Sequence, residues 1–414
     1  MHLKRIHARP APRLAPRPFI RRQPFPAQVT AGAQAAIGGT LTEEAPLKRI
    51  LAAALAAFLP IQNAGLAVAC TAVNVVAADK TVIAGRTMEW AFDMKWTLKS
   101  IPKGTTLTLT APADLGLPEK KVATLYSAVG ISAEVIPGGA IIEGQNAAGL
   151  GMSGNFLPGF TTYQTVTKAD TAYVSILGFG AWALGMHGSV ADVRAALEKT
   201  KVWADASLPS GPTPPTIHMV FTDRSGASII VEYVGGALQI HDNVASVLTN
   251  SPPYDWHLLN LRNYLNLSTM GVNDRRFGTA NVTAIGQGGG ATGLPGDFTP
   301  PSRFVRAAFM RHSMAQPKDG ADAITTIGHI LNTVDIPLGV AQSKDGETVV
   351  SDYTQWVAIK DLTHNRMVIS DYAHRTTFIT LDLDAIFAQD KPSARLVTDL
   401  PFPAAVDGTA ALKN

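Results

Sequence analysis

Runs of apolar, often β-branched residues, separated by short polar turns, predict three β-hairpins after residue 69. Strands of this kind are typical of sheets that are half or fully buried. The paired segments are 71–77 with 81–88, 217–222 with 229–233, and 356–360 with 367–372. The first turn is Ala78-Asp79-Lys80 and the second is Asp223-Arg224-Ser225-Gly226. Because Cys70 directly precedes the first run, we expect it to begin a central strand.

Helical periodicity appears between these hairpins. Ser189 is a predicted N-cap with Asp192 three residues later, and Val190, Val193 and Leu197 recur along one helical face. Segments 303–314 and 322–334 are also predicted to be helical. Hairpins interleaved with helices, without regular strand–helix alternation, indicate an α+β layered fold. We find neither an internal repeat nor a linker that would divide residues 70–414, and therefore predict one domain there.

Residues 1–69 are predicted to be a leader that is removed. Its first 46 residues are rich in Pro, Arg and Ala and are expected to be unfolded. Lys48 and Arg49 then precede an apolar stretch, Ile50–Leu59, and Ala67-Val68-Ala69 forms a small-residue cleavage site before Cys70. This order is typical of a secretory signal peptide. A membrane anchor is the weaker reading, because a spanning helix needs about 20 apolar residues. We expect an exported protein, periplasmic or secreted, with no stable membrane span after cleavage.

Composition and charge support a soluble globular protein. The chain has 414 residues, of which 46% are hydrophobic and 16% charged, enough for a sizeable core. The net charge of +3 divides into +7 for residues 1–69 and −4 for the remainder, since nine of the 35 Lys and Arg lie in the leader with only two of the 32 acidic residues. No basic stripe remains in the folded part, so no nucleic-acid partner is expected.

Cys70 is the only cysteine in the sequence. An exported chain with one cysteine forms no internal disulfide, which leaves a lipid anchor, a packed thiol or a nucleophile. A lipoprotein signal usually has Leu three residues before its Cys; here that residue is Ala67, and Leu66 lies one place too early. The lipid-anchor reading stays open at this point.

An N-terminal cysteine would carry a nucleophile and a base on one residue. The sulfur attacks an amide, and the free α-amine accepts the proton. Such a site needs a cation that favours thiolate, an acceptor for the amine and donors for the oxyanion. Arg86 and Glu89 end the second predicted strand, which returns towards Cys70. They are the charges that this chemistry requires.

Several later segments have the same order as motifs of a known family. They are 149–156 (GLGMSGNF), 248–257 (LTNSPPYDWH), 293–298 (GLPGDF), 302–304 (SRF) and 353–356 (YTQW). Together with Cys70 and Arg86-x-x-Glu89, they resemble the choloylglycine hydrolase family of bile salt hydrolases and penicillin V acylases, within the N-terminal nucleophile hydrolases. The resemblance extends from Cys70 to about residue 382. It implies a four-layer αββα sandwich.

The resemblance also implies roles for individual residues. Cys70 matches the nucleophile, Arg86 the cation beside it, and Glu89 stands where the family has Asp, a longer side chain with the same charge. Asn250 matches the residue whose side chain completes the oxyanion hole, and Arg303 matches a second active-site cation. The main-chain N–H of Phe156 is aligned with the other oxyanion donor. Trp90 occupies a position that contacts an aromatic or apolar acyl group.

The implied activity is hydrolysis of a linear C–N amide bond in a small-molecule substrate through a thioester. Penicillin V, conjugated bile salts and N-acyl homoserine lactones are the implied substrate classes; export and the YTQW strand favour a penicillin V acylase-like enzyme. No cofactor or metal is expected, because the histidines are scattered and the GxGxxA pattern at 286–291 precedes a Pro-containing loop. The family implies a homotetramer, with 257–301 as an assembly arm. The alternatives are a lipid-anchored binding protein, or a catalytically silent relative suggested by Glu89.

Overall fold

The computed structural model describes residues 69–136, 139–204 and 214–413, apart from the side chain at 345. The predicted unfolded leader and signal peptide lie outside these residues, except for Ala69. None of the described helices has the length and hydrophobicity needed to span a bilayer.

Cys70 lies in the first of two large antiparallel sheets. Strands β1 (Cys70–Val76) and β2 (Val82–Trp90) form the predicted first hairpin, with Cys70 opposite Met88. Lys80 takes the left-handed conformation (φ 75°) that closes its turn. The order in the sheet is β14 (Val247–Leu248), β1, β2, β18 (Thr348–Asp361), β19 (Arg366–Asp371) and β20 (Ile379–Asp382), and β17 (Ala341–Asp345) also pairs with β18. The third predicted hairpin forms part of β18 and β19 in this sheet.

The second large sheet contains the second predicted hairpin and several strands that the sequence patterns did not predict. Its order is β13 (Ala237–Asp242), β12 (Ser228–Val234), β11 (Ile217–Asp223), β8 (Leu150–Phe156), β7 (Ala140–Asn146), β6 (Ala128–Ala133), β3 (Trp96–Ile101) and β21 (Ala394–Leu396). Three small two-stranded sheets pair β4 (Thr106–Leu109) with β5 (Lys120–Ala123), β9 (Tyr173–Ser175) with β10 (Lys201–Trp203), and β15 (Arg275–Phe277) with β16 (Ala280–Val282).

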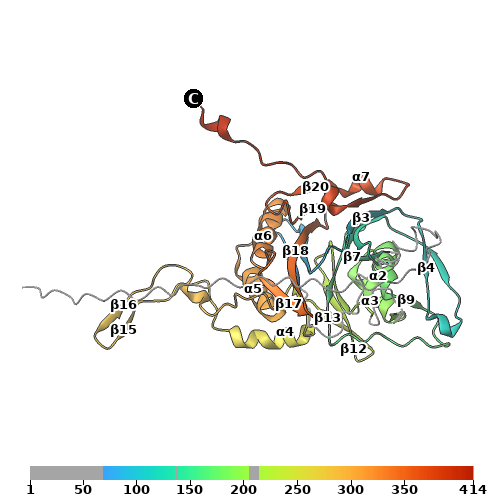
Figure 1. The fold of residues 1–414 in the computed structure, drawn as a ribbon, viewed down its shortest axis with the longest axis horizontal. Coiled ribbons are helices and arrows are strands. Elements are labelled where there is room, and N and C mark those ends of the chain that lie inside the picture. The colour runs from blue at the N-terminus through green and yellow to red at the C-terminus, as the bar shows by residue number, and fades with distance from the viewer. Residues whose placement is uncertain (1–68, 137–138, 205–213, 414) are drawn as a thin grey trace, which may run out of the picture. The chain divides into compact units, whose positions relative to one another are not determined.

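Helices cover the outer face of each large sheet (Figure 1). On the first sheet lie α5 (Pro300–Ser313) and α6 (Gly320–Asn332), and on the second lie α2 (Ile176–Met186) and α3 (Val190–Leu197). Two short helices, α4 (Tyr254–Asn260) and α7 (Leu383–Phe387), are peripheral. The order helix, sheet, sheet, helix confirms the predicted αββα sandwich. The predicted helices at 303–314 and 322–334 begin two or three residues earlier than expected.

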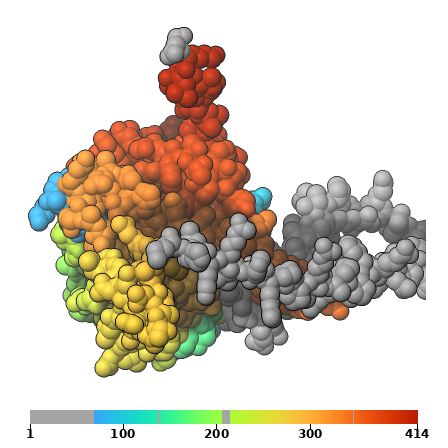
Figure 2. All heavy atoms as spheres, turned by 90° about the vertical axis from the view of Figure 1, so that its left-hand side faces the viewer, coloured from blue at the N-terminus to red at the C-terminus, as the bar shows by residue number. Residues whose placement is uncertain are grey.

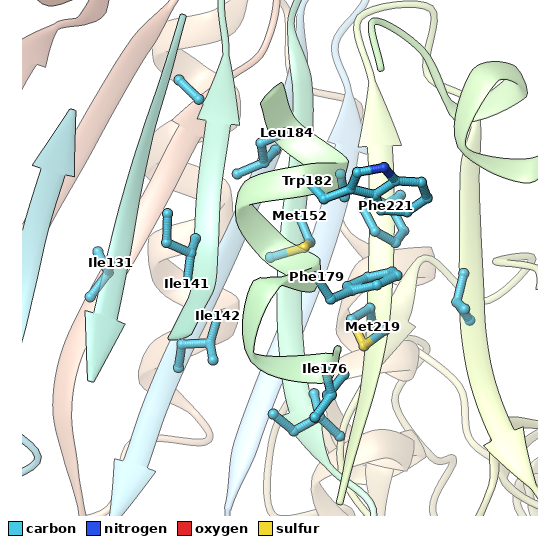
Figure 3. Packing of buried hydrophobic residues seen from close by; sticks show 14 of the residues in the cluster. Ile131, Ile141, Ile142, Met152, Ile176, Phe179, Trp182, Leu184, Met219 and Phe221 are labelled. Carbon is cyan, nitrogen blue, oxygen red and sulfur yellow. The ribbon is translucent and has the colours of Figure 1, made fainter. Parts of the chain in front are cut away.

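Close packing of helix on sheet depends on glycine at two contacts. A Cβ at Gly85 in β2 would lie 2.4 Å from Ile327 of α6, and one at Gly180 in α2 would lie 2.1 Å from the carbonyl oxygen of Ile141. Around Gly180, Phe179 and Trp182 of α2 pack on the sheet among Met152, Met219 and Phe221 (Figure 3). The hydrophobic core therefore continues from the space between the sheets to the helix layer outside the second sheet.

Two described segments are largely exposed. Between α4 and α5, the segment 265–299 carries exposed apolar side chains such as Leu265, Met270 and Ile285, and Figure 2 shows the yellow part of the chain at the surface beside the orange helices. Its β15–β16 hairpin is exposed throughout. The C-terminal residues from Pro403 to Lys413 are also exposed. The role of 257–301 as an assembly arm stays a prediction.

Candidate active site

Cys70 is fully buried between the two sheets, and its sulfur faces cationic and N–H donors. Arg86 Nη2 lies 3.4 Å from Cys70 Sγ, and Met88 Sδ lies 3.8 Å away. The backbone N–H of Glu89 also lowers the pKa of the thiol. In the uncleaved chain the Cys70 nitrogen is a peptide nitrogen joined to Ala69, which is itself buried.

Burial and charge act in opposite directions on the Cys70 thiol. Burial is the larger effect and raises its pKa, because a thiolate is poorly solvated in the interior. The positive charges of Arg86 and Arg303 lower the pKa, whereas the negative charge of Glu89 raises it. The Arg86 contact therefore favours the reactive thiolate against the desolvation that burial imposes.

Asn250 and Arg303 hold the backbone of Cys70 from the other side. The Cys70 nitrogen donates to Asn250 Oδ1 at 2.6 Å, and Asn250 Nδ2 donates to the carbonyl oxygen of Phe156 at 3.0 Å. Arg303 Nη2 donates to the same Asn250 Oδ1 at 2.8 Å, and its Nη1 donates to the Cys70 carbonyl oxygen at 2.6 Å and to Thr71 Oγ1 at 2.7 Å. One amide hydrogen of Asn250 remains for another acceptor.

The segment before α5 explains how Arg303 reaches this position. Asp297 accepts hydrogen bonds from the Thr299 N–H and the Ser302 hydroxyl, which brace the first turn of the helix. Arg303 then donates from Nε to the carbonyl oxygen of Phe298 and is fully buried. Burial lowers the pKa of Arg303 to about 10, and the nearby carboxylate of Glu89 partly opposes that shift. The guanidinium is therefore still charged at neutral pH.

Glu89 is buried but its carboxylate contacts hydroxyl groups. Thr87 Oγ1 donates to Glu89 Oε2 at 3.0 Å, and Thr354 Oγ1 donates to Oε1 at 2.7 Å. Burial raises the pKa of Glu89 to about 7, and Arg303 and the two threonines oppose this shift. Asn250, not the Glu89 carboxylate, accepts the hydrogen bond from the Cys70 nitrogen. The predicted role of Glu89 in orienting the free amine stays a prediction.

The two buried carboxyls near Arg303 predict a pH-dependent stability. Burial raises the pKa of both Glu89 and Asp352 to about 7. The folded state therefore holds these protons more tightly than the unfolded state, and stability falls as pH rises from about 4 through 7. We expect Asp352→Asn to reduce the difference between melting temperatures measured at pH 5 and pH 8.

The matched control for that measurement is Asp399→Asn, because Asp399 is exposed. It should show the same difference between the two melting temperatures as the unaltered chain. If Asp352→Asn also kept that full difference, Asp352 would make no contribution to the pH dependence.

Trp90 lies beside the site and forms one wall of a hydrophobic pocket. Its ring packs against Phe156 with centroids 4.5 Å apart. The pocket is otherwise lined almost entirely by apolar side chains of the second sheet, α2 and the segments that flank them, among them Met94, Ile141, Ile176, Phe179 and Met219. Two residues that line the pocket also contact the site around Cys70. The Gly154 carbonyl oxygen accepts from Arg86 Nη2 at 2.7 Å, and the Phe156 carbonyl oxygen accepts from Asn250.

Residues that sequence reasoning missed connect the site to its surroundings. Asn155 Oδ1 accepts from Arg86 Nε at 3.1 Å, while Asn155 Nδ2 donates to the Thr249 carbonyl oxygen at 2.9 Å. Asn155 thus bridges β2 and the segment that carries Asn250. It is the residue next to Phe156 in a motif already noted, and strand alternation would have pointed its side chain opposite to that of Phe156.

A buried histidine network also supports the segment around Asn250. His218 lies between Glu232 Oε1, 2.7 Å from its Nδ1, and the Thr249 carbonyl oxygen, 3.0 Å from its Nε2. His257 Nε2 lies 2.8 Å from the Asn250 carbonyl oxygen, and its ring stacks on Phe304. Burial lowers the pKa of His257 to about 4, so it is neutral near pH 7. No sequence motif marked His218, and His257 ends the motif 248–257 but was given no role there.

No group of three or more His, Cys, Asp or Glu among the described residues has an arrangement that would hold a metal ion. The chemistry that the geometry offers is nucleophilic, centred on one thiol with two guanidinium groups and an amide around it.

Comparison with known proteins places this geometry in a family. The profile of the linear amide C–N hydrolases, choloylglycine hydrolase family, matches residues 70–385. The chain belongs to this family. As a choloylglycine hydrolase family member, it is a hydrolase of linear amide C–N bonds. The matched region begins at Cys70 and contains every predicted site residue.

Individual relatives of this family member act on different amides. A bile salt hydrolase/transferase of Clostridium perfringens is 30% identical over 292 residues, covering 70% of this chain and 86% of the relative. A solved variant of the conjugated bile acid hydrolase from the same species superimposes with a TM-score of 0.69 at 28% identity, covering 79% of this chain and 96% of that one. The penicillin V acylase of Agrobacterium tumefaciens shares the fold, with a TM-score of 0.62, 22% identity and coverage of 78% and 90%.

Proposed function

We propose that this chain hydrolyses a linear amide through Cys70, which acts as an N-terminal nucleophile once the leader is removed. The observation that carries the proposal is the convergence of Arg86, Asn250 and Arg303 on Cys70. These residues come from three parts of the sequence and make their contacts at the sulfur, the nitrogen and the carbonyl oxygen of one residue. A structural cysteine in a core needs no such set of partners.

Each step of the reaction has a group in the site. Cleavage before Cys70 would free its α-amine, which takes the thiol proton as sulfur attacks the substrate carbonyl carbon. The second amide hydrogen of Asn250, together with the main-chain N–H predicted at Phe156, would stabilise the oxyanion. As this intermediate collapses, the C–N bond breaks, the α-ammonium of Cys70 gives its proton to the leaving amine, and a thioester remains on Cys70. Water then attacks the thioester, releasing the carboxylic acid and restoring the thiol.

The pocket beside Trp90 supports an apolar or aromatic acyl group as the part of the substrate that is bound. Its walls are apolar, and two of its lining residues, Gly154 and Phe156, accept hydrogen bonds from Arg86 and Asn250 of the site. Burial of such a group supplies binding free energy of about 25 cal/mol per Å². We propose penicillin V acylase-like activity, with N-acyl homoserine lactones and conjugated bile salts as the other substrate classes.

A lipid-anchored binding protein on the same scaffold is the alternative from another class. That protein would carry a diacylglyceryl group on Cys70 Sγ. Such a group would have to displace Met88 and Arg86 from the sulfur, whereas a nucleophile makes use of the Arg86 contact. This observation favours the enzyme. The catalytically silent relative is tested by turnover alone.

Hydrolysis of a substrate panel tests the proposal directly. The chain would be expressed with its leader, purified from the exported fraction, and incubated with penicillin V, glycine- and taurine-conjugated bile salts, and N-acyl homoserine lactones. We expect equal amounts of acid and amine from at least one class, and an intact mass that corresponds to a chain starting at unmodified Cys70. A diacylglyceryl-modified Cys70 without turnover would support the binding protein.

Location and assembly are part of the same proposal. We propose that the leader directs export to the periplasm or the medium, and that the mature enzyme is a homotetramer assembled through 257–301. The exposed apolar side chains of this segment support that role, because such residues are commonly covered by a neighbouring subunit.

A further inference from the structure

Three charged side chains are buried together between the two large sheets, and one of them contacts Cys70. Arg86 comes from β2, Lys360 from β18 and Glu143 from β7 of the opposite sheet. None of the three is more than 1% exposed. Buried ions of this kind are costly unless they are paired, so their arrangement calls for an explanation.

Lys360 forms an ion pair with one oxygen of the Glu143 carboxylate. Its Nζ makes a short contact with Glu143 Oε1 and also donates to the Met152 carbonyl oxygen at 3.1 Å and to Ser153 Oγ at 3.0 Å. Burial and the nearby Arg86 charge lower the pKa of Lys360. Three acceptors around one nitrogen oppose that shift, because they match the three N–H groups of an ammonium ion.

Arg86 faces the other oxygen of the Glu143 carboxylate without forming a hydrogen bond to it. Glu143 Oε2 lies 3.8 Å from Arg86 Nη1, and within the described parts of the chain neither atom has a hydrogen-bond partner. The other face of the guanidinium is engaged, with Nη2 on the Gly154 carbonyl oxygen and Cys70 Sγ and Nε on Asn155. Arg86 therefore stands between a carboxylate that it does not quite reach and the sulfur that it contacts.

We propose that Lys360 is a positioning residue that holds the Glu143 carboxylate away from Arg86, so that the Arg86 charge stays directed at the Cys70 sulfur. The proposal rests on the proposed function of Cys70 and adds Lys360 and Glu143 to the residues that set its reactivity. Neither contacts the sulfur; both act through Arg86.

Removal of Lys360 alone is expected to change the surroundings of the Arg86 charge. In Lys360→Met, Glu143 would lose its partner, and the nearest remaining cation is Arg86 at 3.8 Å. A bidentate Arg–carboxylate pair is a favourable geometry for both groups. Its formation would draw the guanidinium from Cys70 and neutralise its charge, so the thiolate would be less stabilised.

The test is the pH dependence of Cys70 alkylation by iodoacetamide in the mature protein. Thiolate is the reacting form, so the rate follows the thiol titration. We expect Lys360→Met to move this profile upward by about one pH unit, equivalent to roughly a tenfold slower reaction on the rising limb. Lys360→Arg should retain most of the original profile. Lys344→Met, at an exposed position in β17, is the matched control and should change nothing.

A double variant distinguishes specific coupling from general damage. In Lys360→Met with Glu143→Leu, both members of the pair become apolar, so no carboxylate remains to capture Arg86. We expect its alkylation profile to return to that of the unaltered protein. Replacing a whole buried pair by apolar residues is often tolerated, so this variant can fold where Lys360→Met does not. In that case an upward shift of its own profile would overturn the proposal, because no carboxylate is left to capture Arg86.

Where Lys360→Met folds, two results would overturn the proposal. One is a folded Lys360→Met protein with an unshifted profile; the other is a double variant whose profile is shifted as far as that of the single variant. The remaining charged groups that face the thiol, Glu89 on β2 and Arg303 on α5, are unchanged in all variants, as is Asp352, which faces Arg303.

Failure of this proposal is separable from failure of the proposed function. Alkylation reports thiol reactivity without any amide substrate, whereas the substrate panel reports turnover. If the protein hydrolyses no amide but shows the predicted shift, the Lys360 proposal stands and the proposed hydrolase function fails. Turnover with an unshifted profile would do the reverse.

Discussion

Cys70→Ala is expected to abolish amide hydrolysis, with kcat reduced by roughly 10⁴-fold or more. Magnitudes of this order follow removal of a covalent nucleophile, because the remaining groups bind substrate and stabilise charge without forming the acyl-enzyme. Cys70→Ser should lose most of the activity. Its hydroxyl is far less acidic than a thiol, so the Arg86 guanidinium cannot hold it as the anion. Initial rates of amine release on the preferred substrate of the panel provide the measurement.

Two controls accompany the Cys70 variants. N-terminal sequencing must show that each preparation begins at residue 70, so that a failure to remove the leader is not taken for a failure of catalysis. Thermal melting must show that Cys70→Ala still folds, since the residue is part of the core. Undiminished turnover in a correctly processed Cys70→Ala protein would refute the nucleophile.

Asn250→Ala should give the second-largest loss, about 10²- to 10³-fold in kcat, which is typical for removal of one oxyanion donor. In the structure Asn250 accepts from the Cys70 nitrogen and from Arg303 and donates to Phe156, so alanine removes an acceptor and a donor together. The effect on KM should be smaller, because the oxyanion exists only after attack.

Asn250→Asp separates the two roles of this side chain. Aspartate retains an oxygen for the Cys70 nitrogen and Arg303 but has no N–H for an oxyanion. If the donor matters, the Asp variant will be as slow as the Ala variant; near-normal kcat in Asn250→Asp would assign Asn250 to holding the Cys70 amine. Asn263→Ala, at an exposed position, serves as the control and should leave kcat unchanged.

Local patterns were enough to predict the parts of the fold in which neighbouring residues pair. The first hairpin was predictable because β-branched runs flank a polar turn, and β1 and β2 pair over their whole length. The N-cap of α3 was predictable because Ser189 accepts from the Asp192 N–H, as its spacing indicated. Strands β6–β8 were missed, since their glycines and polar residues weaken the alternation that marks a half-buried strand.

The residues of the candidate site also differ in whether the sequence could predict them. Arg86 could be placed near Cys70 by hairpin geometry alone, and Asn250 and Arg303 could be proposed only through the family resemblance. Lys360 and Glu143 escaped both routes. Each stands at the end of an apolar run on its strand, and they are 217 positions apart in the sequence. A pairing of that kind depends on how two sheets face each other, which no local pattern encodes.

The two ends of the proposed mature enzyme differ in what can be attached to them. The Cys70 nitrogen is buried against Asn250, and the proposed mechanism needs it as a free amine. The last residues, Pro403 to Lys413, are exposed instead. An affinity tag or a surface tether for this enzyme therefore belongs at the C-terminus. An N-terminal tag placed in the leader would be lost if the leader is removed as proposed. Amine-directed immobilisation would be unsuitable, because an α-amine has a lower pKa than a lysine and therefore reacts first.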